Sequence, residues 1–215
     1  MTSTLDRIKE GKVIAIVRGI PSTSIVDLVN ALLAGGVSCV EVTFDQSSTE
    51  KTKDSLKAIS TIKKTFGDKV AVGAGTIMTV EQVHQAVEAG AEYIISPNIN
   101  EAVIRETKKL GKVSIPGGCT PTEVANAYEY GADIVKLFPA GVLGAGYVKA
   151  LKAPLKHIPL TAVGGVSPDN CRSFIDAGAI GVGCGGKLVS QKLVSEGKFD
   201  EITETAKAYM DALSK

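Results

Sequence analysis

The sequence contains no tryptophan, two histidines and four cysteines among 215 residues. The cysteines show neither CxxC spacing nor a spacing with histidine that is typical of metal ligands; they are Cys39, Cys119, Cys171 and Cys184. His84 and His157 each fall in a segment that the pattern predicts as a helix or a helix end. We therefore expect free thiols, as in a reducing cytoplasm. The sequence gives poor support to a metal site or to a catalytic triad that uses histidine.

Long apolar runs and a strong net charge are also missing. No stretch approaches the ~18 uninterrupted apolar residues of a membrane-spanning helix, and the polar start MTSTLDRIKEGK lacks the apolar centre of a secretion signal. The formal net charge is +1, which predicts no basic surface for nucleic acid or an anionic membrane. With 44% hydrophobic and 22% charged residues, the composition predicts a globular cytoplasmic protein without nucleic-acid or membrane partners.

The chain does contain a repeat, in which a glycine is soon followed by a short apolar run. The segments are AGGVSCVEVT at 34–43, TFGDKVAVG at 65–73, EAGAEYIIS at 88–96, KLGKVSIPG at 109–117, EYGADIVKL at 129–137 and DAGAIGVG at 176–183. Glycine tolerates the left-handed conformation just past a helix C-terminus, so each segment predicts a helix end and then a strand. The long gap between Gly131 and Gly178 leaves room for one more unit at KAPLKHIPLTAVGG.

Helix-start signals agree with this alternation. TVEQ at 79–82 and TPTE at 120–123 match a capping box, and SPDN at 167–170 places a proline after a serine in the same way. A first strand at VIAIVR, 13–18, brings the total to eight strands separated by helices. We predict one domain, 1–215, that folds as a single (β/α)8 TIM barrel with a short N-terminal helix. An open doubly wound sheet is the rival, but it usually has fewer strands, and no GxGxxG follows the first one.

Three charged residues stand at predicted strand ends, where (β/α)8 barrels carry their chemistry. Arg18 follows AIV, Glu41 lies in CVEVTF and Lys136 lies in IVKLF. Because strand side chains alternate between faces, Lys136 shares its face with Ile134 and Phe138. If these faces point into the barrel, the three charges converge on a small volume. The structural alternatives are an ion pair between Glu41 and Lys136, or a lysine that reaches solvent.

Of these three residues, Lys136 says most about function, because an ammonium group is among the side-chain groups that cost most to bury unpaired. Burial disfavours the charged form of lysine, and the neutral amine is a nucleophile toward ketones. A carboxylate such as that of Glu41 can shuttle protons beside it. The pair predicts Schiff-base catalysis.

Glycines at the last two strand ends predict a second binding site. AVGGVSPDN and GVGCGGKL each place glycines before a predicted helix, at Gly164, Gly165, Gly183, Gly185 and Gly186. In (β/α)8 barrels these loops frequently bind phosphate through backbone N–H groups and a helix N-terminus. The alternative is that the glycines serve only tight turns and that Lys187 is only solvated.

Together these segments resemble the class I aldolases that cleave 2-keto-3-deoxy-6-phosphogluconate and 4-hydroxy-2-oxoglutarate. The resemblance covers essentially the whole chain, in the order IVRGI, GGVSCVEVTF, VGAGT, GAEYIISPN, IPGGCTPTE, VKLFPA, VKALKAP, VGGVSPDN and GVGCGGKLV. It implies a lyase of carbohydrate metabolism, in the Entner-Doudoroff pathway, that releases pyruvate with glyceraldehyde 3-phosphate or glyoxylate. It also implies a homotrimer of barrels that uses no metal and no cofactor.

The resemblance assigns roles to individual residues. Lys136 carries the Schiff base and Glu41 is the proton-transferring carboxylate. The remaining expected contacts are Arg18, Gly75 and Thr76 for the pyruvate carboxylate, Phe138 as a pocket wall, Pro116 and Thr161 as further substrate-binding residues, and Gly164, Gly165, Gly185 and Gly186 for phosphate.

The sequence departs from the family pattern at three positions. Asp45 stands where many members have an arginine that binds the carboxylate, so that role would fall on Arg18. Val163 replaces the threonine of the PTGG sequence, and this form is similar to enzymes acting on the 4-epimer, 2-keto-3-deoxy-6-phosphogalactonate. Gly186 replaces a serine often found at the last phosphate loop. The substrate epimer is thus open, and a phosphate-handling barrel isomerase or a non-catalytic sugar-phosphate sensor is the rival function.

Overall fold

Strands and helices alternate along the chain in the computed structural model of the protein, which describes residues 3–214. The strands are β1 Val13–Val17, β2 Cys39–Thr43, β3 Ala71–Gly75, β4 Tyr93–Ile95, β5 Val113–Ile115, β6 Gly117–Gly118, β7 Val135–Leu137, β8 Leu160–Val163 and β9 Gly181–Cys184. The α-helices are α1 Thr4–Gly11, α2 Ile25–Ala34, α3 Thr49–Phe66, α4 Val80–Glu88, α5 Glu101–Lys109, α6 Pro121–Glu129, α7 Ala140–Lys152, α8 Cys171–Asp176, α9 Gln191–Ser195 and α10 Phe199–Ser214.

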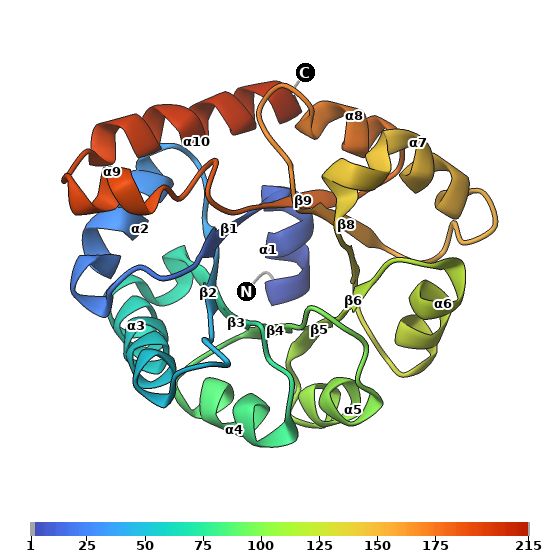
Figure 1. Cartoon of the computed structure of the whole chain (residues 1–215), viewed down its shortest axis with the longest axis horizontal. Helices are drawn as coiled ribbons and strands as arrows, with labels where there is room; N and C mark the ends of the chain where they lie inside the picture. Colours follow the sequence, from blue (N-terminus) through green and yellow to red (C-terminus); the bar gives the residue numbers. More distant parts are fainter. Residues whose placement is uncertain (1–2, 215) are drawn as a thin grey trace.

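The strands are all parallel and form one sheet that curves into a barrel, with the helices around its outside (Figure 1). The strand order is β5-β4-β3-β2-β1-β9-β8-β7-β6. Pro116 divides the predicted fifth strand, so that β5 pairs with β4 while β6 pairs with β7. Proline has no N–H to give to a sheet, which accounts for the division. The predicted (β/α)8 barrel with an N-terminal helix is confirmed.

One glycine in each of the six repeat segments was predicted to end a helix in the left-handed conformation: Gly35, Gly67, Gly90, Gly111, Gly131 and Gly178. Five of the six adopt this conformation. Gly67, Gly90, Gly111, Gly131 and Gly178 all have positive φ. At the end of α2, however, the left-handed residue is Gly36, with φ 87°, and the prediction for Gly35 was wrong. A Cβ on Gly35 would lie 2.7 Å from the carbonyl oxygen of Thr203, so this glycine allows α10 to pack closely on α2.

Of the three predicted helix starts, one is confirmed in full, one is confirmed in part and one was wrong. At α6 the capping box is complete, with Thr120 and Glu123 each bonded to the other's backbone. At α4, Thr79 accepts from the N–H of Gln82, but the Gln82 side chain bonds elsewhere. The prediction for SPDN was wrong, because α8 begins only at Cys171 and the proline lies in a turn before it.

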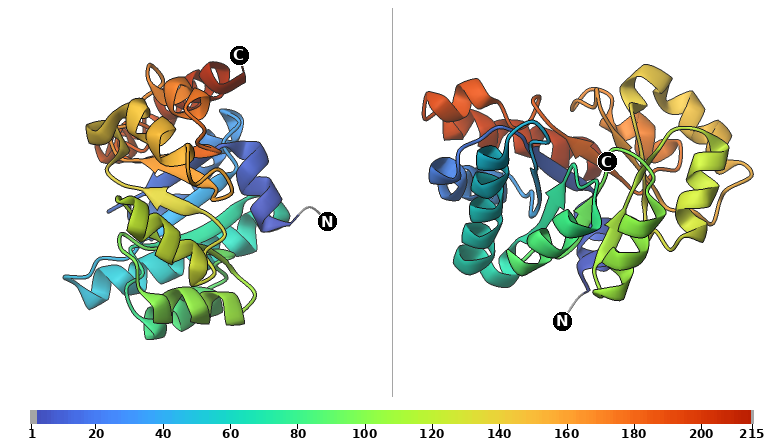
Figure 2. Two further views of the ribbon diagram at one scale, coloured as in Figure 1. Left: turned by 90° about the vertical axis from the view of Figure 1, so that its right-hand side faces the viewer. Right: turned by 60° about the horizontal axis from the view of Figure 1, so that its bottom comes forward.

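The barrel has an apolar floor at the N-terminal end of its strands. Inward-facing residues of five strands, together with the residue just before β7, form it: Ile14, Cys39, Ala71, Tyr93, Ile95, Val113, Ile115 and Ile134. Ile8 of α1 packs against the same cluster, so α1 closes this end of the barrel (Figure 2). The open end, at the strand C-termini, therefore carries the site.

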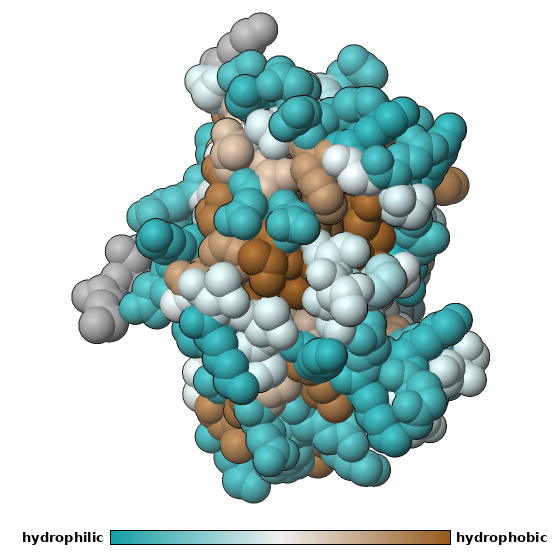
Figure 3. Space-filling model, turned by 90° about the vertical axis from the view of Figure 1, so that its left-hand side faces the viewer, coloured by the Kyte–Doolittle hydropathy of each residue, from teal (hydrophilic) through white to brown (hydrophobic). Residues whose placement is uncertain are grey.

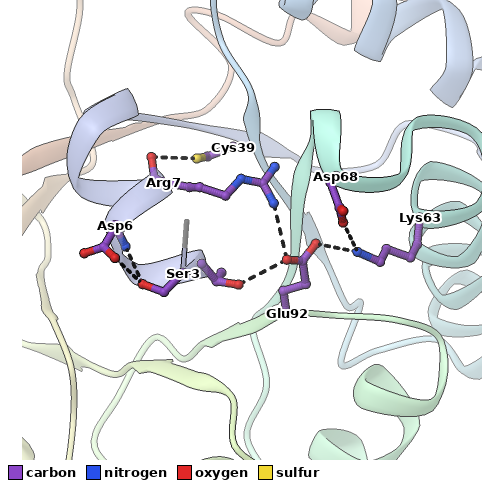
Figure 4. A network of polar contacts seen from close by, with 8 residues as sticks. Ser3, Asp6, Arg7, Cys39, Lys63, Asp68 and Glu92 are labelled. Carbon is purple, nitrogen blue, oxygen red and sulfur yellow. Dashed lines mark hydrogen bonds and ion pairs between the residues drawn. The ribbon is translucent and has the colours of Figure 1, made fainter. Parts of the chain in front are cut away.

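A polar network centred on Glu92 attaches α1 to the barrel (Figure 4). The Glu92 carboxylate accepts a hydrogen bond from the Thr4 hydroxyl, 3.1 Å away, and lies 3.5 Å from Arg7 Nη1. Its other oxygen is 3.1 Å from Lys63 Nζ of α3, which also contacts Asp68 at 3.6 Å. Glu92 precedes β4, so one carboxylate ties a strand to α1 and α3.

All four cysteines are unpaired, and three of them are buried. Burial raises the pKa of the Cys39 thiol to about 11 and that of Cys184 to about 12. Within residues 3–214, no helix is both long and apolar enough to span a membrane. Over the same range, the structure holds no cluster of three or more His, Cys, Asp or Glu side chains arranged to bind a metal ion.

Candidate active site

Lys136 and Glu41 both point into the barrel, above the apolar floor. The side chain of Lys136 is 6% exposed and that of Glu41 is 1% exposed. Lys136 Nζ lies 5.4 Å from the centroid of the Phe138 ring, which is 44% exposed at the mouth. Neither Lys136 nor Glu41 forms an ion pair or a side-chain hydrogen bond with another residue between Ser3 and Ser214. The structural ion pair that the sequence left open is therefore not formed.

The electrostatics of Glu41 are set by its burial and by two cations. Burial raises the pKa of the Glu41 carboxyl, while the positive charges of Lys136 and Arg18 act to lower it. The net direction is upward. A carboxyl with a raised pKa exchanges protons more readily near neutral pH than an ordinary glutamate does.

Two glycines on the inner face of β3 make room for larger side chains, and one of them accommodates this carboxyl. A Cβ on Gly75 would overlap Oε1 of Glu41 and lie 2.5 Å from its Cδ. Gly73, two residues earlier on the same face, is covered by the ring of Tyr93 in the same way. The predicted site residue Gly75 is therefore the position against which the Glu41 side chain lies.

Arg18 and Thr76 lie together on one side of the mouth. Arg18 Nη2 donates to the Thr76 hydroxyl over 3.4 Å. Both residues line a cleft of about 860 Å³, together with Asp45, Gln46 and Gln191. A second cleft of about 540 Å³, on the other side, is bordered by Phe138 and the glycines of β6. Lys136 and Glu41 line neither cleft, because they are almost completely buried.

Pro116, just before β6, and Thr161 on β8 adjoin Lys136 from its two sides. The carbonyl oxygen of Pro116 accepts a 2.8 Å hydrogen bond from the backbone N–H of Lys136. Thr161 is paired with Lys136 in the register of β7 and β8. Its hydroxyl is buried and has no hydrogen-bond partner in the part of the chain that the structure describes. Each of the two residues thus lies beside β7, next to Lys136.

The predicted phosphate loops lie side by side, because β8 and β9 are paired. Gly164 and Gly165 have φ of 91° and 73°, a conformation that only glycine adopts easily. The backbone N–H groups of Gly165, Gly186 and Lys187 donate to no other residue among those from Ser3 to Ser214. We expected a helix directly after each of these glycine loops, and this was wrong, since α8 begins only at Cys171 and α9 only at Gln191. The loops therefore offer backbone N–H groups rather than a helix N-terminus.

Comparison with known proteins gives a family for this site. A model of the family "KDPG and KHG aldolase" matches residues 5–205. The chain belongs to this family. The 2-dehydro-3-deoxy-6-phosphogalactonate aldolase of Escherichia coli K12 is 37% identical over 93% of this chain and 95% of its own. The 2-dehydro-3-deoxy-phosphogluconate aldolase of Treponema pallidum is 33% identical over 94% of each.

Solved structures agree with the sequence relatives. A native KDPGal structure shares 36% of its sequence with this aldolase over 94% of each chain, with a TM-score of 0.83. A KDPG aldolase from Legionella pneumophila, with pyruvate captured as a covalent carbinolamine, shares 26%, with a TM-score of 0.86 over 97% of this chain and 98% of its own. The predicted class, a carbon–carbon lyase of the Schiff-base aldolase family, is confirmed, and the isomerase and sensor alternatives have no support.

The aspartate that replaces the family arginine is turned to its own loop. Asp45 Oδ1 accepts from the N–H of Ser47 at 2.9 Å and from its hydroxyl at 2.6 Å. Lys51 Nζ lies 3.2 Å from the other oxygen. The hydrogen bonds from Ser47, followed by the one from Lys51, lower the pKa of Asp45 to about 2. Asp45 is thus partnered without Arg18, which leaves that guanidinium available to a substrate.

Two polar residues in and beneath the mouth of this aldolase were not predicted from its sequence. Gln46 bonds the carbonyl of Thr76, and nothing in the loop sequence indicated this contact. Tyr93 lies in the barrel floor with a buried hydroxyl that has no partner among residues 3–214. The alternation of side chains along β4 would have placed Tyr93 inside the barrel. It would not have shown that the Tyr93 ring covers Gly73.

Proposed function

We propose that this aldolase forms its Schiff base on Lys136 and transfers protons with Glu41. The observation that carries the proposal is the burial of a lysine side chain at the barrel mouth without a counter-ion within 4 Å in residues 3–214. An amine attacks a ketone as a nucleophile, and a buried lysine without a counter-ion has no carboxylate to occupy its amine. Glu41 supplies a carboxylate from the inner face of β2, a strand that is not adjacent to β7.

The reaction follows from these two groups. Lys136 Nζ attacks the C2 ketone of the substrate, and loss of water from the carbinolamine gives an iminium. Glu41 accepts the proton of the C4 hydroxyl, directly or through a water. The C3–C4 bond then breaks, and its electron pair moves toward the iminium nitrogen to form an enamine. Glyceraldehyde 3-phosphate leaves, after which protonation of C3 and hydrolysis release pyruvate and restore the amine.

Arg18 and Thr76 are proposed to hold the carboxylate end of the substrate. The guanidinium offers a charge-assisted hydrogen bond, and the hydroxyl of Thr76 lies within 3.4 Å of it. Gly75 leaves space for Glu41 beside them. Phe138, Pro116 and Thr161 surround Lys136 and are proposed to line the pocket for the reacting carbons.

The phosphate is proposed to bind at the other end of the mouth. The loops containing Gly164, Gly165, Gly185 and Gly186 offer unbonded backbone N–H groups there. Gly164 also packs on Phe138, since a Cβ on Gly164 would lie 3.0 Å from Cε2 of that ring. A substrate anchored at both ends would therefore pass over Phe138 and Lys136.

Two substrate epimers are candidates for this pocket. The first is 2-dehydro-3-deoxy-6-phosphogluconate, with 4-hydroxy-2-oxoglutarate as a smaller substrate, as the family as a whole suggests. The second is 2-dehydro-3-deoxy-6-phosphogalactonate, and Val163 together with the 37% identical relative favours it. Pyruvate release from the three compounds, measured side by side with a coupled dehydrogenase, tests this choice. We expect the largest kcat/KM for the galactonate epimer, and a preference for the gluconate epimer would reverse the assignment.

Reductive trapping tests the nucleophile. The aldolase is incubated with pyruvate and borohydride, digested, and the peptide that carries the adduct is identified by mass. Lys136→Met should lose the adduct and slow turnover by several orders of magnitude. Lys152→Met is the control, since the pKa of Lys152 is lowered by burial but its amine bonds the carbonyls of Lys156 and Ile158. An adduct on any lysine but Lys136 would contradict the proposal.

We also propose that residues 1–215 act as a single domain and assemble as a homotrimer in the cytoplasm, and that cleavage of the gluconate epimer serves the Entner-Doudoroff pathway. One similar structure is described as a cage designed by fusing symmetric oligomeric domains; it is 36% identical, with a TM-score of 0.83 over 94% of this chain and 72% of its own. Apolar side chains also gather on the face shown in Figure 3, between polar margins. Light scattering should give three times the mass of one chain, and a monomer would refute the assembly. Loss of growth on gluconate after gene deletion would support the pathway.

A further inference from the structure

Thr76 has a backbone conformation that is unusual for a β-branched residue. Its φ is 60°, and Lys12 is the other non-glycine residue with positive φ in the described range. Side chains branched at Cβ are strained in this left-handed region. Such strain persists only where surrounding contacts hold the residue in place, and it concentrates at functional sites.

Gln46 holds the strained residue from a different loop. Its Nε2 donates a 2.6 Å hydrogen bond to the carbonyl oxygen of Thr76, 30 residues further along the chain. Gln46 is itself fixed by Gln82 in the first turn of α4, whose Nε2 donates to Gln46 Oε1 over 2.9 Å. Gln82 Oε1 in turn accepts from the backbone N–H of Met78 over 2.8 Å. The two amide side chains thus bond both ends of the short segment from Thr76 to Met78.

The side chain of Thr76 reaches Arg18, over 3.4 Å, from the same backbone position that Gln46 fixes. Gly75, the preceding residue, lies against the Glu41 carboxyl. A rotation of the backbone at Thr76 would therefore move the hydroxyl away from Arg18 and disturb the wall behind Glu41.

We propose that Gln46 is a positioning residue, whose carboxamide holds Thr76 in its left-handed conformation and so aims the Thr76 hydroxyl, beside Arg18, at the carboxylate of the substrate. This inference rests on the proposed function, in which Arg18 and Thr76 bind that carboxylate. A neutral amide suits this task, since it adds no negative charge that would compete for Arg18. Lys51 and Ser47 engage the neighbouring Asp45, which otherwise would compete.

The first experiment replaces Gln46 by leucine, which is similar in size but forms no hydrogen bond. Exchange of the methyl protons of pyruvate for deuterium, followed by NMR, reports enamine formation without the sugar acid. We expect the KM for pyruvate to rise about tenfold in Gln46→Leu, with a smaller change in kcat, because a ground-state contact is weakened. Gln85→Leu is the matched control on α4; Gln85 bonds Glu81 and does not contact Thr76.

A double-mutant cycle separates positioning from other roles. Glycine adopts positive φ without strain, so in a Thr76→Gly background the loss of Gln46 should raise KM no further. If the two changes instead raise KM independently, Gln46 does not act through Thr76 and the inference is overturned. The thermal midpoint of each variant shows whether folding is affected.

Failure of the inference and failure of the proposed function give different results. If Gln46→Leu leaves KM within about twofold of the wild type while Arg18→Met and Thr76→Val raise it, the carboxylate site stands and the role of Gln46 is overturned. If none of these variants raises KM, the carboxylate site itself is wrong, and the inference falls with it. Borohydride trapping at Lys136 in saturating pyruvate verifies that the nucleophile is intact throughout.

Discussion

The absence of a side chain at Gly75 can be tested directly, because the structure shows what an added methyl group would meet. In Gly75→Ala the new Cβ would overlap Oε1 of Glu41 and lie 2.5 Å from Cδ and 2.7 Å from Cγ. The strand itself need not change, since Gly75 does not have positive φ. The substitution therefore acts on the side chain of Glu41 and not on the fold.

The size of the effect follows from the overlap. Carbon atoms in contact lie about 3.5–4.0 Å apart, so Cγ of Glu41 must move by roughly 1 Å, and its carboxyl group by more. A misplacement of about 1 Å costs on the order of 100-fold in rate. We expect kcat for sugar-acid cleavage to fall about 100-fold in Gly75→Ala, with a small change in thermal midpoint, because the moving atoms end a flexible side chain.

Pyruvate release at saturating substrate measures this loss, and Gly146→Ala is the control, since a Cβ there meets nothing within 4 Å. Should Gly75→Ala fold poorly, the double variant Glu41→Asp/Gly75→Ala resolves the cause. The shorter carboxylate relieves the overlap, so the thermal midpoint should recover while turnover stays low. A Gly75→Ala enzyme with kcat within threefold of the wild type would refute the role given to Glu41.

Two further predictions use titration and burial. At saturating substrate, kcat should fall as the pH drops through the raised pKa of Glu41, because only the carboxylate accepts a proton. Arg18→Met removes a positive charge that lowers this pKa, so the midpoint of the pH profile should move to higher pH. An unchanged midpoint would exclude Glu41 as the titrating base. Tyr93→Phe should raise the free energy of unfolding, measured in urea, by about 1 kcal/mol, because it removes a buried hydroxyl without a partner. Tyr209→Phe is the comparison: the Tyr209 hydroxyl donates to the carbonyl oxygen of Val166 over 2.9 Å, so its loss should lower the free energy of unfolding by a similar amount. Equal destabilisation by both would show that the Tyr93 hydroxyl is bonded.

The fold was predictable because its signals are local. A glycine after a helix and a capping box before one depend on a few adjacent residues, so the helix ends at Gly67, Gly90 and Gly131 and the start at Thr120 could be located from sequence. Lys136 and Glu41 could also be placed inside, since alternation along a strand fixes the face. Gln46 could not, because its contact with Thr76 joins two irregular loops that have no periodicity. The start of α8 was misplaced for a related reason: a serine followed by proline also suits the turn that precedes it.

The arrangement of the barrel interior explains why an apolar floor and a charged mouth occur on the same strands. Tyr93, Ile95 and Ile115 fill the barrel below Glu41, and α1 closes the end beneath them. Burial above this floor raises the pKa of Glu41. Gly75 on β3, which has no side chain, leaves space for Glu41. The packing that stabilises the lower half of the barrel therefore also contributes to the burial that raises the pKa of Glu41. Changes to α1 or its Glu92 network that admit water to the floor should reach the chemistry through Glu41.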